Sequence, residues 1–369
     1  MYTVLKNGII LTGSQRLHNC ALIIENDRIK DIVAENDISD QAEIINCNGN
    51  YIATGLIDLQ IYGGGGLMFS DDPSPGALKQ MADSLVASGT TSFLVTLATN
   101  SLDIFRKAIK VVKENPHPAV LGLHFEGPYL NSTKSGAHLK QFIKKAGVDE
   151  VSDLLSEADG CLKMMTIAPE LCSDEVIALL KENNVVISAG HSNATFAEAI
   201  DGFNKGVTTA THLFNAMSGL HHRDTGLPGA IFNSADVYSS VIADGIHIDY
   251  PSLKISKKVM GERLFLITDA VEESRGPYTH VRKTDRYILD DGTLSGSMLT
   301  MLTAVKNCVQ HAGIELEEAL RMASVYPAKV IGNDKIGRIA IGSAADIIVF
   351  DKELSLKQVF SKGTSIWLD

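Results

Sequence analysis

Polar side chains able to do chemistry stand near the ends of apolar runs in the middle of the chain. The runs VLGLHFEG, VVISAGHS and TTATHLFNA carry Glu126, His191 and His212. One carboxylate and two imidazoles form a common ligand set for a catalytic divalent metal, with a fourth position open to water. Any one of them alone is more often structural, but ionisable groups gathered inside a protein are costly unless they bind a metal or one another. Together they predict one metal site.

A second carboxylate, Asp269, ends the apolar run LFLITDA. Metal-dependent hydrolysis needs a group that takes a proton from water and a group that protonates the leaving group, and Asp269 could do both. It could instead hold a neighbouring histidine or cap the next segment. His247 could face a substrate or bond a loop carbonyl. His124 is expected to lie one layer deeper in the barrel, where it would pack or support the site residues. Glu170 is expected to have a structural role.

These residues need a scaffold that brings the ends of several strands together. Apolar runs alternate with helical stretches, and we expect strands at 56–62, 91–99, 120–127, 162–170, 185–192, 208–216, 239–247 and 264–270. Eight such runs predict an α/β fold, a (β/α)8 TIM-type barrel whose active site lies at the C-terminal ends of the strands. Helices at 297–312 and 316–324 would close the ring. An open, doubly wound sheet is the competing fold.

The two ends of the chain have a different pattern from its middle. Residues 1–54 contain short alternating runs broken by Gly, Asn and Asp, which is typical of a small antiparallel β unit. IGRIAIGSAADIIVFD and a last strand around LKQVFSKGTSIWL have the same character. We therefore expect one small β-sandwich built from 1–54 and 336–369, and a catalytic barrel over 55–335.

Composition narrows the function classes. The formal net charge of -11 argues against binding to nucleic acid or to anionic membranes, so an anionic substrate would have to be held by a few local cations. The sequence has no long uncharged apolar run, so no transmembrane helix is expected, and its first residues lead us to expect no signal peptide. Five scattered cysteines without CxxC spacing favour free thiols in a reducing compartment. A cytoplasmic globular protein is expected.

Seven segments together resemble the N-acetylglucosamine-6-phosphate deacetylase family of the amidohydrolase superfamily: GLIDLQ, LHFEGPYLN, SAGHSNAT, THLFNAM, ADGIH, LITDA and DGTLSGSMLTM. The resemblance covers essentially the whole chain. It implies hydrolysis of N-acetylglucosamine 6-phosphate to glucosamine 6-phosphate and acetate. It also implies one divalent metal held by Glu126, His191 and His212, with Asp269 acting as general base toward water and then as acid toward the amine.

The resemblance also implies contacts with the phosphosugar. His138 would hydrogen-bond the acetyl carbonyl oxygen, and Arg223 would reach the phosphate from the partner subunit of a homodimer, although it could be a solvated loop residue. His221 and His222 could reinforce the anion site or belong to the surface. The remaining implied contacts are Ala137, Asn215, Ala216, His247 and the backbone of Leu294, Ser295 and Gly296.

The first run, LIDLQIY, departs from two-metal members of the superfamily, which use a His-x-His pair there and a bridging carboxylate. Gln60 and Tyr62 occupy the pair's positions, and Lys163 lies near the start of its run instead of its end. An amide and a phenol cannot replace two imidazoles as ligands. We therefore expect one ion per subunit, Zn²⁺ as first choice with Fe²⁺, Co²⁺ or Mn²⁺ as alternatives.

Other functions remain open. The chain could be another amidohydrolase, such as a cyclic-amide hydrolase, or a deacetylase of a different N-acetylhexosamine 6-phosphate. A catalytically silent assembly or regulatory protein of this fold should have lost a metal ligand or Asp269, and all four residues are present.

Overall fold

The computed structural model describes residues 2–38, 42–274 and 276–367. Eight parallel strands form its centre, each paired with its neighbour in chain order. Their bounds are β8 Leu56–Ile61, β11 Thr90–Ala98, β12 Val120–Glu126, β13 Leu162–Ile167, β14 Val186–Ala189, β15 Thr209–Ala210, β16 Tyr238–Ile242 and β17 Leu264–Ile267.

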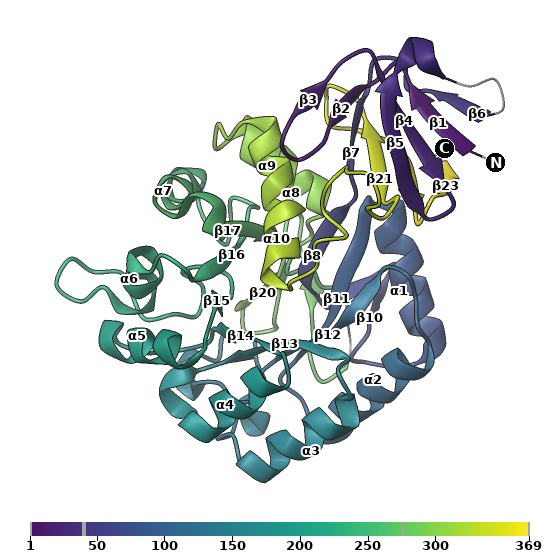
Figure 1. The fold of residues 1–369 in the computed structure, drawn as a ribbon. Helices are drawn as coiled ribbons and strands as arrows, with labels where there is room; N and C mark the ends of the chain where they lie inside the picture. Colours follow the sequence, from purple (N-terminus) through teal and green to yellow (C-terminus); the bar gives the residue numbers. More distant parts are fainter. Residues whose placement is uncertain (1, 39–41, 275, 368–369) are drawn as a thin grey trace.

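The sheet closes on itself just beyond the ends of β8 and β17. Ile61 and Ala270 form a parallel bridge, and the Asp269 N–H donates to the Gln60 carbonyl at 3.0 Å. The Tyr62 N–H donates to the Ala270 carbonyl at 3.0 Å. This closure confirms the predicted (β/α)8 barrel and excludes the open sheet (Figure 1).

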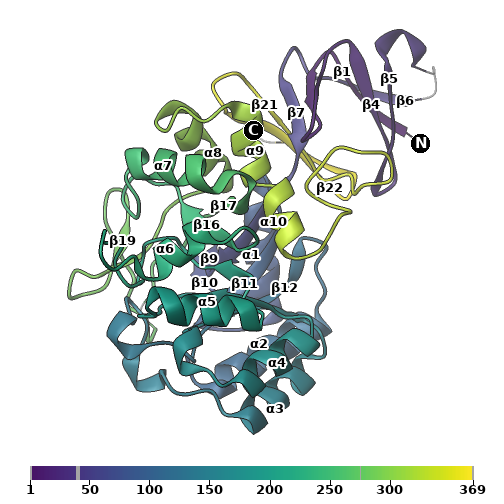
Figure 2. The ribbon, with the colours of Figure 1, turned by 60° about the vertical axis from the view of Figure 1, so that its left-hand side comes forward.

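Helices surround the barrel (Figure 2). Their bounds are α1 Pro75–Ala87, α2 Leu102–Glu114, α3 Val148–Ala158, α4 Asp174–Glu182, α5 Phe196–Lys205, α6 Gly226–Asn233, α7 Tyr250–Met260, α8 Met301–Gln310, α9 Leu316–Met322 and α10 Val325–Val330. Several begin at side-chain caps. Thr195 and Glu198 form a reciprocal capping box at α5, which satisfies amide groups that the first turn leaves without partners. The two predicted final helices, at 297–312 and 316–324, correspond to α8 and α9, and α10 follows them.

Two small sheets lie to one side of the barrel and combine both ends of the chain (Figures 1 and 2). One contains β1 Tyr2–Lys6, β4 Cys20–Glu25, β5 Arg28–Ala34 and β6 Ala42–Asn46. The other contains β2 Ile9–Leu11, β3 Arg16–Leu17, β7 Tyr51–Thr54, β21 Ile347–Phe350, β22 Leu356–Ser361 and β23 Thr364–Trp367.

The expectation of a purely antiparallel unit is wrong, because β1 pairs with β6, and β2 with β7, in parallel. The expected last strand is a hairpin of β22 and β23, turning at Lys362 and Gly363, which both have positive φ. The division into 1–54 with 336–369 and 55–335 stays a prediction.

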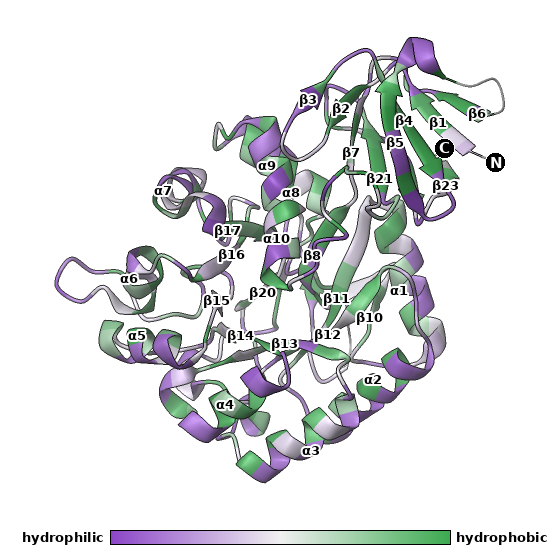
Figure 3. Cartoon of the chain, in the orientation of Figure 1, coloured by the Kyte–Doolittle hydropathy of each residue, from purple (hydrophilic) through white to green (hydrophobic). Residues whose placement is uncertain are grey.

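Apolar side chains divide into two main cores. The larger fills the barrel and the space beneath its helices, and the smaller lies between the two terminal sheets around Leu5, Leu22 and Ile347. Figure 3 shows the barrel strands mostly in the colour of hydrophobic residues, whereas the surrounding helices alternate between the two colours. Among the described residues, no helix is long and apolar enough to span a membrane. All five cysteines are unpaired.

All eight barrel strands end earlier than expected, and β14, β15 and β17 each end two residues before a candidate site residue. His191 has a φ of 46°, His212 of 38° and Asp269 of 54°, so each leaves the extended conformation. Alternation along a strand therefore accounts for the orientation of Glu126, which is the last residue of β12, but not for these three residues. Non-glycine residues with such φ values are uncommon and concentrate at functional sites.

Candidate functional site

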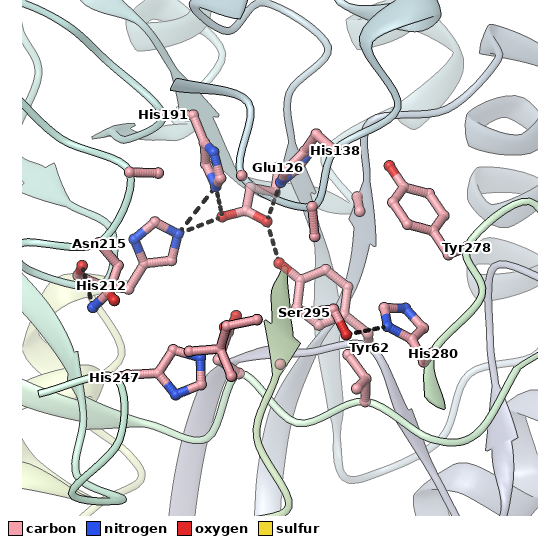
Figure 4. Close-up of a pocket in the computed structure, with 18 of the residues that line it drawn as sticks. Tyr62, Glu126, His138, His191, His212, Asn215, His247, Tyr278, His280 and Ser295 are labelled. Carbon is pink, nitrogen blue, oxygen red and sulfur yellow. Dashed lines mark hydrogen bonds and ion pairs between the residues drawn. The ribbon is translucent and has the colours of Figure 1, made fainter. Parts of the chain in front are cut away.

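The three predicted metal ligands meet at the C-terminal end of the barrel. Glu126 Oε1 lies 3.1 Å from His212 Nε2 and 3.3 Å from His191 Nε2, and the two imidazole nitrogens are 3.1 Å apart (Figure 4). All three side chains are buried. Glu126 is the last residue of β12, and His191 and His212 each lie two residues beyond the end of their own strand.

The arrangement fits a divalent metal. Four-coordinate zinc with bonds of about 2.0–2.1 Å places neighbouring ligand atoms about 3.3 Å apart, close to the spacing found here. His191 Nδ1 donates to the Lys134 carbonyl at 2.8 Å, which leaves its Nε2 lone pair free. His212 Nδ1 is buried without a hydrogen-bond partner among the described residues, whereas its Nε2 faces Glu126 and His191 and is the atom that could bind an ion. Glu126, His191 and His212 could therefore hold one metal ion.

The second oxygen of Glu126 has its own partners. His138 Nε2 lies 3.0 Å from Oε2, and the Tyr62 hydroxyl donates to the same oxygen. Burial alone would raise the pKa of Glu126, but His138 and His191 bring it well below its usual value. Burial, followed by the charge of Glu126, raises the pKa of Tyr62, so the phenol stays a donor.

His138 is fixed in one tautomer by Thr99. The Thr99 backbone N–H donates to His138 Nδ1 at 3.2 Å, so the ring proton must be on Nε2, which faces the pocket. Burial lowers the pKa of His138 to about 4, because the charged imidazole would be poorly solvated there. At neutral pH the ring is therefore an uncharged hydrogen-bond donor.

Asp269 lies across the cluster, close to Gln60. The Gln60 amide donates to Asp269 Oδ1 at 2.7 Å, and its nitrogen also lies 3.1 Å from Glu126 Oε1. Burial raises the pKa of Asp269, and the charge of Glu126 raises it further, although His212 and His247 oppose them. A carboxyl group with a raised pKa is suited to accept and return a proton near neutral pH.

These groups open into one pocket of about 160 Å³. Besides the three ligands and Asp269, it is lined by these predicted substrate contacts: Ala137, His138, Asn215, Ala216, His247, Leu294, Ser295 and Gly296. His247 donates from Nδ1 to Asp244 at 2.6 Å, so its Nε2 is the nitrogen left for a substrate. The other predicted contact, Arg223, does not line the pocket.

Arg223 lies on an exposed turn beyond Asn215 and Ala216. His221 and Asp224 exchange backbone hydrogen bonds across this turn, at 2.9 and 3.0 Å, and the side chains of His221, His222 and Arg223 are exposed. No Lys or Arg is among the described residues that line the pocket. The part of the pocket that the structure describes thus has hydrogen-bonding groups and carboxylates, but no fixed cation for a phosphate.

Glu170 has the structural role expected for it. It accepts hydrogen bonds from the Asn131 side chain at 3.0 Å, the Ser192 hydroxyl at 2.7 Å and the Asn193 N–H at 2.8 Å. It therefore joins the loops after β12, β13 and β14 beside His191.

Sequence reasoning missed several pocket residues, among them Tyr278 and His280, which lie in the segment between β17 and β20 (Leu294–Gly296). The Tyr278 hydroxyl donates to the Thr99 carbonyl, and His280 Nδ1 lies 3.0 Å from the Ser295 hydroxyl (Figure 4). This segment has no apolar periodicity, so the sequence held no signal that it returns to the barrel mouth.

Comparison with known proteins agrees with this geometry. The amidohydrolase family model matches residues 51–366, and the NagA composite domain model matches residues 1–52. N-acetylglucosamine-6-phosphate deacetylase from Haemophilus influenzae is 37% identical, with 95% of each chain covered. A crystal structure of N-acetylglucosamine-6-phosphate deacetylase from Pasteurella multocida superposes with a TM-score of 0.95 at 35% identity, covering 100% of both chains.

One relative has a different printed substrate. N-acetylgalactosamine-6-phosphate deacetylase from a Shewanella strain is 31% identical, with 97% of this chain and 94% of the relative covered. Both kinds of relative span almost the whole chain, as does the combined match of the two family models. The chain therefore belongs to the amidohydrolase family and, within it, groups with the N-acetylglucosamine-6-phosphate deacetylases.

Proposed function

We propose that this chain removes the acetyl group from N-acetylglucosamine 6-phosphate, giving glucosamine 6-phosphate and acetate. The observation that carries the proposal is the joint geometry of the pocket. A Glu126, His191 and His212 cluster with 3.1–3.3 Å between ligand atoms lies between a carboxyl group of raised pKa, Asp269, and a neutral imidazole donor, His138.

The cluster would hold one divalent ion per subunit, with Zn²⁺ as first choice and Fe²⁺, Co²⁺ or Mn²⁺ as alternatives. Such an ion supplies Lewis acidity toward the amide carbonyl and toward water. Glu126 contributes a negative charge and the two histidines neutral nitrogens, a set that does not by itself select among these metals.

Asp269 is proposed as the residue that moves the proton. It takes a proton from water as the water oxygen attacks the acetamide carbon, and it later gives that proton to the sugar nitrogen as the C–N bond breaks. Gln60 donates to Asp269 Oδ1, which leaves Oδ2 for the water and then for the amine. The two half-steps balance, since the proton taken up in the first is returned in the second.

His138 is proposed to stabilise the negative charge that develops on the acetamide oxygen. Its Nε2–H now faces Glu126 Oε2 and would turn to the substrate oxygen when the pocket is filled. Because Thr99 holds the other nitrogen as an acceptor, the proton is already on Nε2 before substrate binds.

The sugar phosphate is proposed to lie near Asn215, Ala216 and His247, and to receive its cation from Arg223 of a second copy in a homodimer. The lack of Lys and Arg among the described pocket residues supports this proposal, because a phosphate close to Glu126 and Asp269 would otherwise be repelled. A guanidinium presents a fork of donors that suits phosphate oxygens.

The unpaired cysteines support a reducing, cytoplasmic location.

The test is acetate release from N-acetylglucosamine 6-phosphate, measured beside the unphosphorylated sugar and N-acetylgalactosamine 6-phosphate. We expect turnover of the first substrate to exceed both others. Equal turnover of the two phosphates would keep the mechanism and widen the substrate range to both epimers. The galacto epimer is included because the Shewanella relative is named for it. No acetate from any of them, with metal bound, would overturn the proposal in favour of another amidohydrolase reaction.

A further inference from the structure

Tyr62 has no part in the chemistry proposed above, yet its hydroxyl lies at the centre of the site. It directly follows β8, is 6% exposed, and packs against Met68, Val271 and Tyr287. This apolar contact fixes the ring, and the hydroxyl donates to Glu126 Oε2 (Figure 4). The Gln60 amide nitrogen lies 3.0 Å from the phenol oxygen.

With the hydrogen bond from Tyr62, the two oxygens of Glu126 have different partners. Oε1 faces His191 and His212 at 3.3 and 3.1 Å, whereas Oε2 faces away from them toward Tyr62 and His138. His138 must release Oε2 to donate to the substrate carbonyl in the mechanism proposed above. Tyr62 then remains as the donor that holds this oxygen.

We propose that Tyr62 is a positioning residue that keeps Glu126 Oε2 out of the metal's coordination, so that Glu126 binds the metal through Oε1 alone. The inference rests on the proposed metal site, but not on the identity of the substrate. In this role Tyr62 acts through Glu126, and its side chain also lines the pocket.

Three physical reasons support this role. A hydrogen bond from a hydroxyl to a carboxylate is charge-assisted and stronger than a neutral one. A carboxylate bound through both oxygens would occupy a coordination position that a hydrolytic centre keeps open. The phenol, which itself accepts from the Gln60 amide, also gives Oε2 a hydrogen-bond donor and so leaves that oxygen less free to bind a second ion. Tyr62 therefore supports the expectation of one ion per site.

The experiment uses the Co²⁺-loaded enzyme, because tetrahedral Co²⁺ absorbs visible light more strongly than Co²⁺ of higher coordination number. Tyr62→Phe removes the hydroxyl and keeps the ring in its apolar contacts, and it is made in a His138→Ala parent because His138 also donates to Oε2 when no substrate is bound. We expect cobalt affinity to fall by about 10- to 100-fold in chelator competition, as for other outer-shell partners of metal ligands. We also expect weaker visible absorption as Oε2 joins the coordination.

Tyr129→Phe is the matched control. Tyr129 is 1% exposed, and its hydroxyl donates to Glu150 at 2.8 Å, away from the pocket. Its removal should leave cobalt affinity and absorption unchanged. A Tyr62→Phe enzyme with the parent's affinity, or with weaker affinity but the parent's spectrum, would overturn the inference. Acetate release is measured separately, so a wrong substrate assignment would leave the cobalt result standing.

Discussion

At the scale of single residues, the two carboxylates of the site are set apart by their neighbours. Histidines surround Glu126 and bring its pKa well below the usual value, whereas burial and the charge of Glu126 raise the pKa of Asp269. Two carboxyl groups with pKa values displaced in opposite directions suit two tasks, a permanent anionic ligand and a proton carrier. This contrast supports the division of roles proposed for them.

Replacing Asp269 tests the proton carrier. In Asp269→Asn the amide can still accept from Gln60 but cannot carry a proton, so acetate release should fall by about 10²- to 10⁴-fold. Metal content after purification should stay at the parent value, because Asp269 is not one of the three clustered ligands. Asp249→Asn, at the start of α7, is the control. Near-parent turnover in Asp269→Asn would rule out the assigned role.

At the scale of elements, the site depends on hydrogen bonds between neighbouring barrel loops. Glu170, in the short 3-10 helix Pro169–Leu171 after β13, accepts from Asn131, Ser192 and Asn193. Those residues lie in the loops after β12 and β14, and the Asn131 N–H also donates to the His191 carbonyl at 2.9 Å. The Glu170 carboxylate thus connects three neighbouring barrel loops. Through Asn131 it also supports the backbone of His191.

Removing this carboxylate should loosen the site without touching a ligand. Glu170→Ala leaves three donors without an acceptor, and we expect about 1–3 kcal/mol lower stability in urea unfolding. Metal affinity should fall as well, because His191 loses its support. Glu175→Ala, an exposed change on α4, should do neither. Parent-like metal binding in Glu170→Ala would show that His191 is held by other contacts.

The segment that carries His280 should make stability sensitive to acid. Burial lowers the pKa of His280 to about 4, compared with about 6.5 for an unperturbed imidazole. The unfolded chain therefore binds a proton that the folded chain excludes, and this ring makes stability fall as pH drops from about 6.5 to about 4.

His280→Gln removes this pH-dependent contribution to the free energy of unfolding. Between about pH 7.5 and about pH 5, the variant should lose less unfolding free energy than the parent, by up to about 2 kcal/mol. Urea unfolding at the two pH values measures the difference. His18→Gln, at an exposed position, is the control. An equal loss in His280→Gln and in the parent would show that this ring accepts a proton in the folded protein.

At the scale of the whole molecule, none of the described residues places a Lys or Arg side chain in the pocket that is proposed to bind a phosphate. The chain carries a formal net charge of -11, and the described pocket residues include Glu126 and Asp269 but neither Lys nor Arg. Arg223 is exposed on a turn outside the pocket. A homodimer that exchanges this arginine would complete each site with a cation from the other copy.

Mixed dimers test this exchange. Arg223→Ala should raise KM for the phosphosugar, and Asp269→Asn should be nearly inactive. If the two variants are co-expressed, half of the dimers are mixed and one of two sites in each is intact, so about a quarter of parent activity should return. Arg106→Ala, which breaks a surface ion pair with Glu157, should give no such pattern. No recovery, or a fully active monomer in sedimentation, would contradict the exchange.

The sequence by itself determined the barrel and most of the site. Buried parallel strands must be apolar along their whole length, so the eight runs were visible, and Glu126, His191, His212 and Asp269 stood at their ends. The terminal strands were recognisable too, because alternation and turn residues are local signals. The parallel pairing of β1 with β6 could not be recognised from the sequence, since it depends on contacts between distant segments.

Only the tertiary structure decided how the site works. The positive φ values of His191, His212 and Asp269 arise where strands give way to loops held from several sides. The tautomer of His138 depends on Thr99, and the position of Glu126 Oε2 depends on Tyr62. These contacts join residues far apart in the chain, and their energies depend on distance, burial and direction, which one-dimensional spacing does not contain.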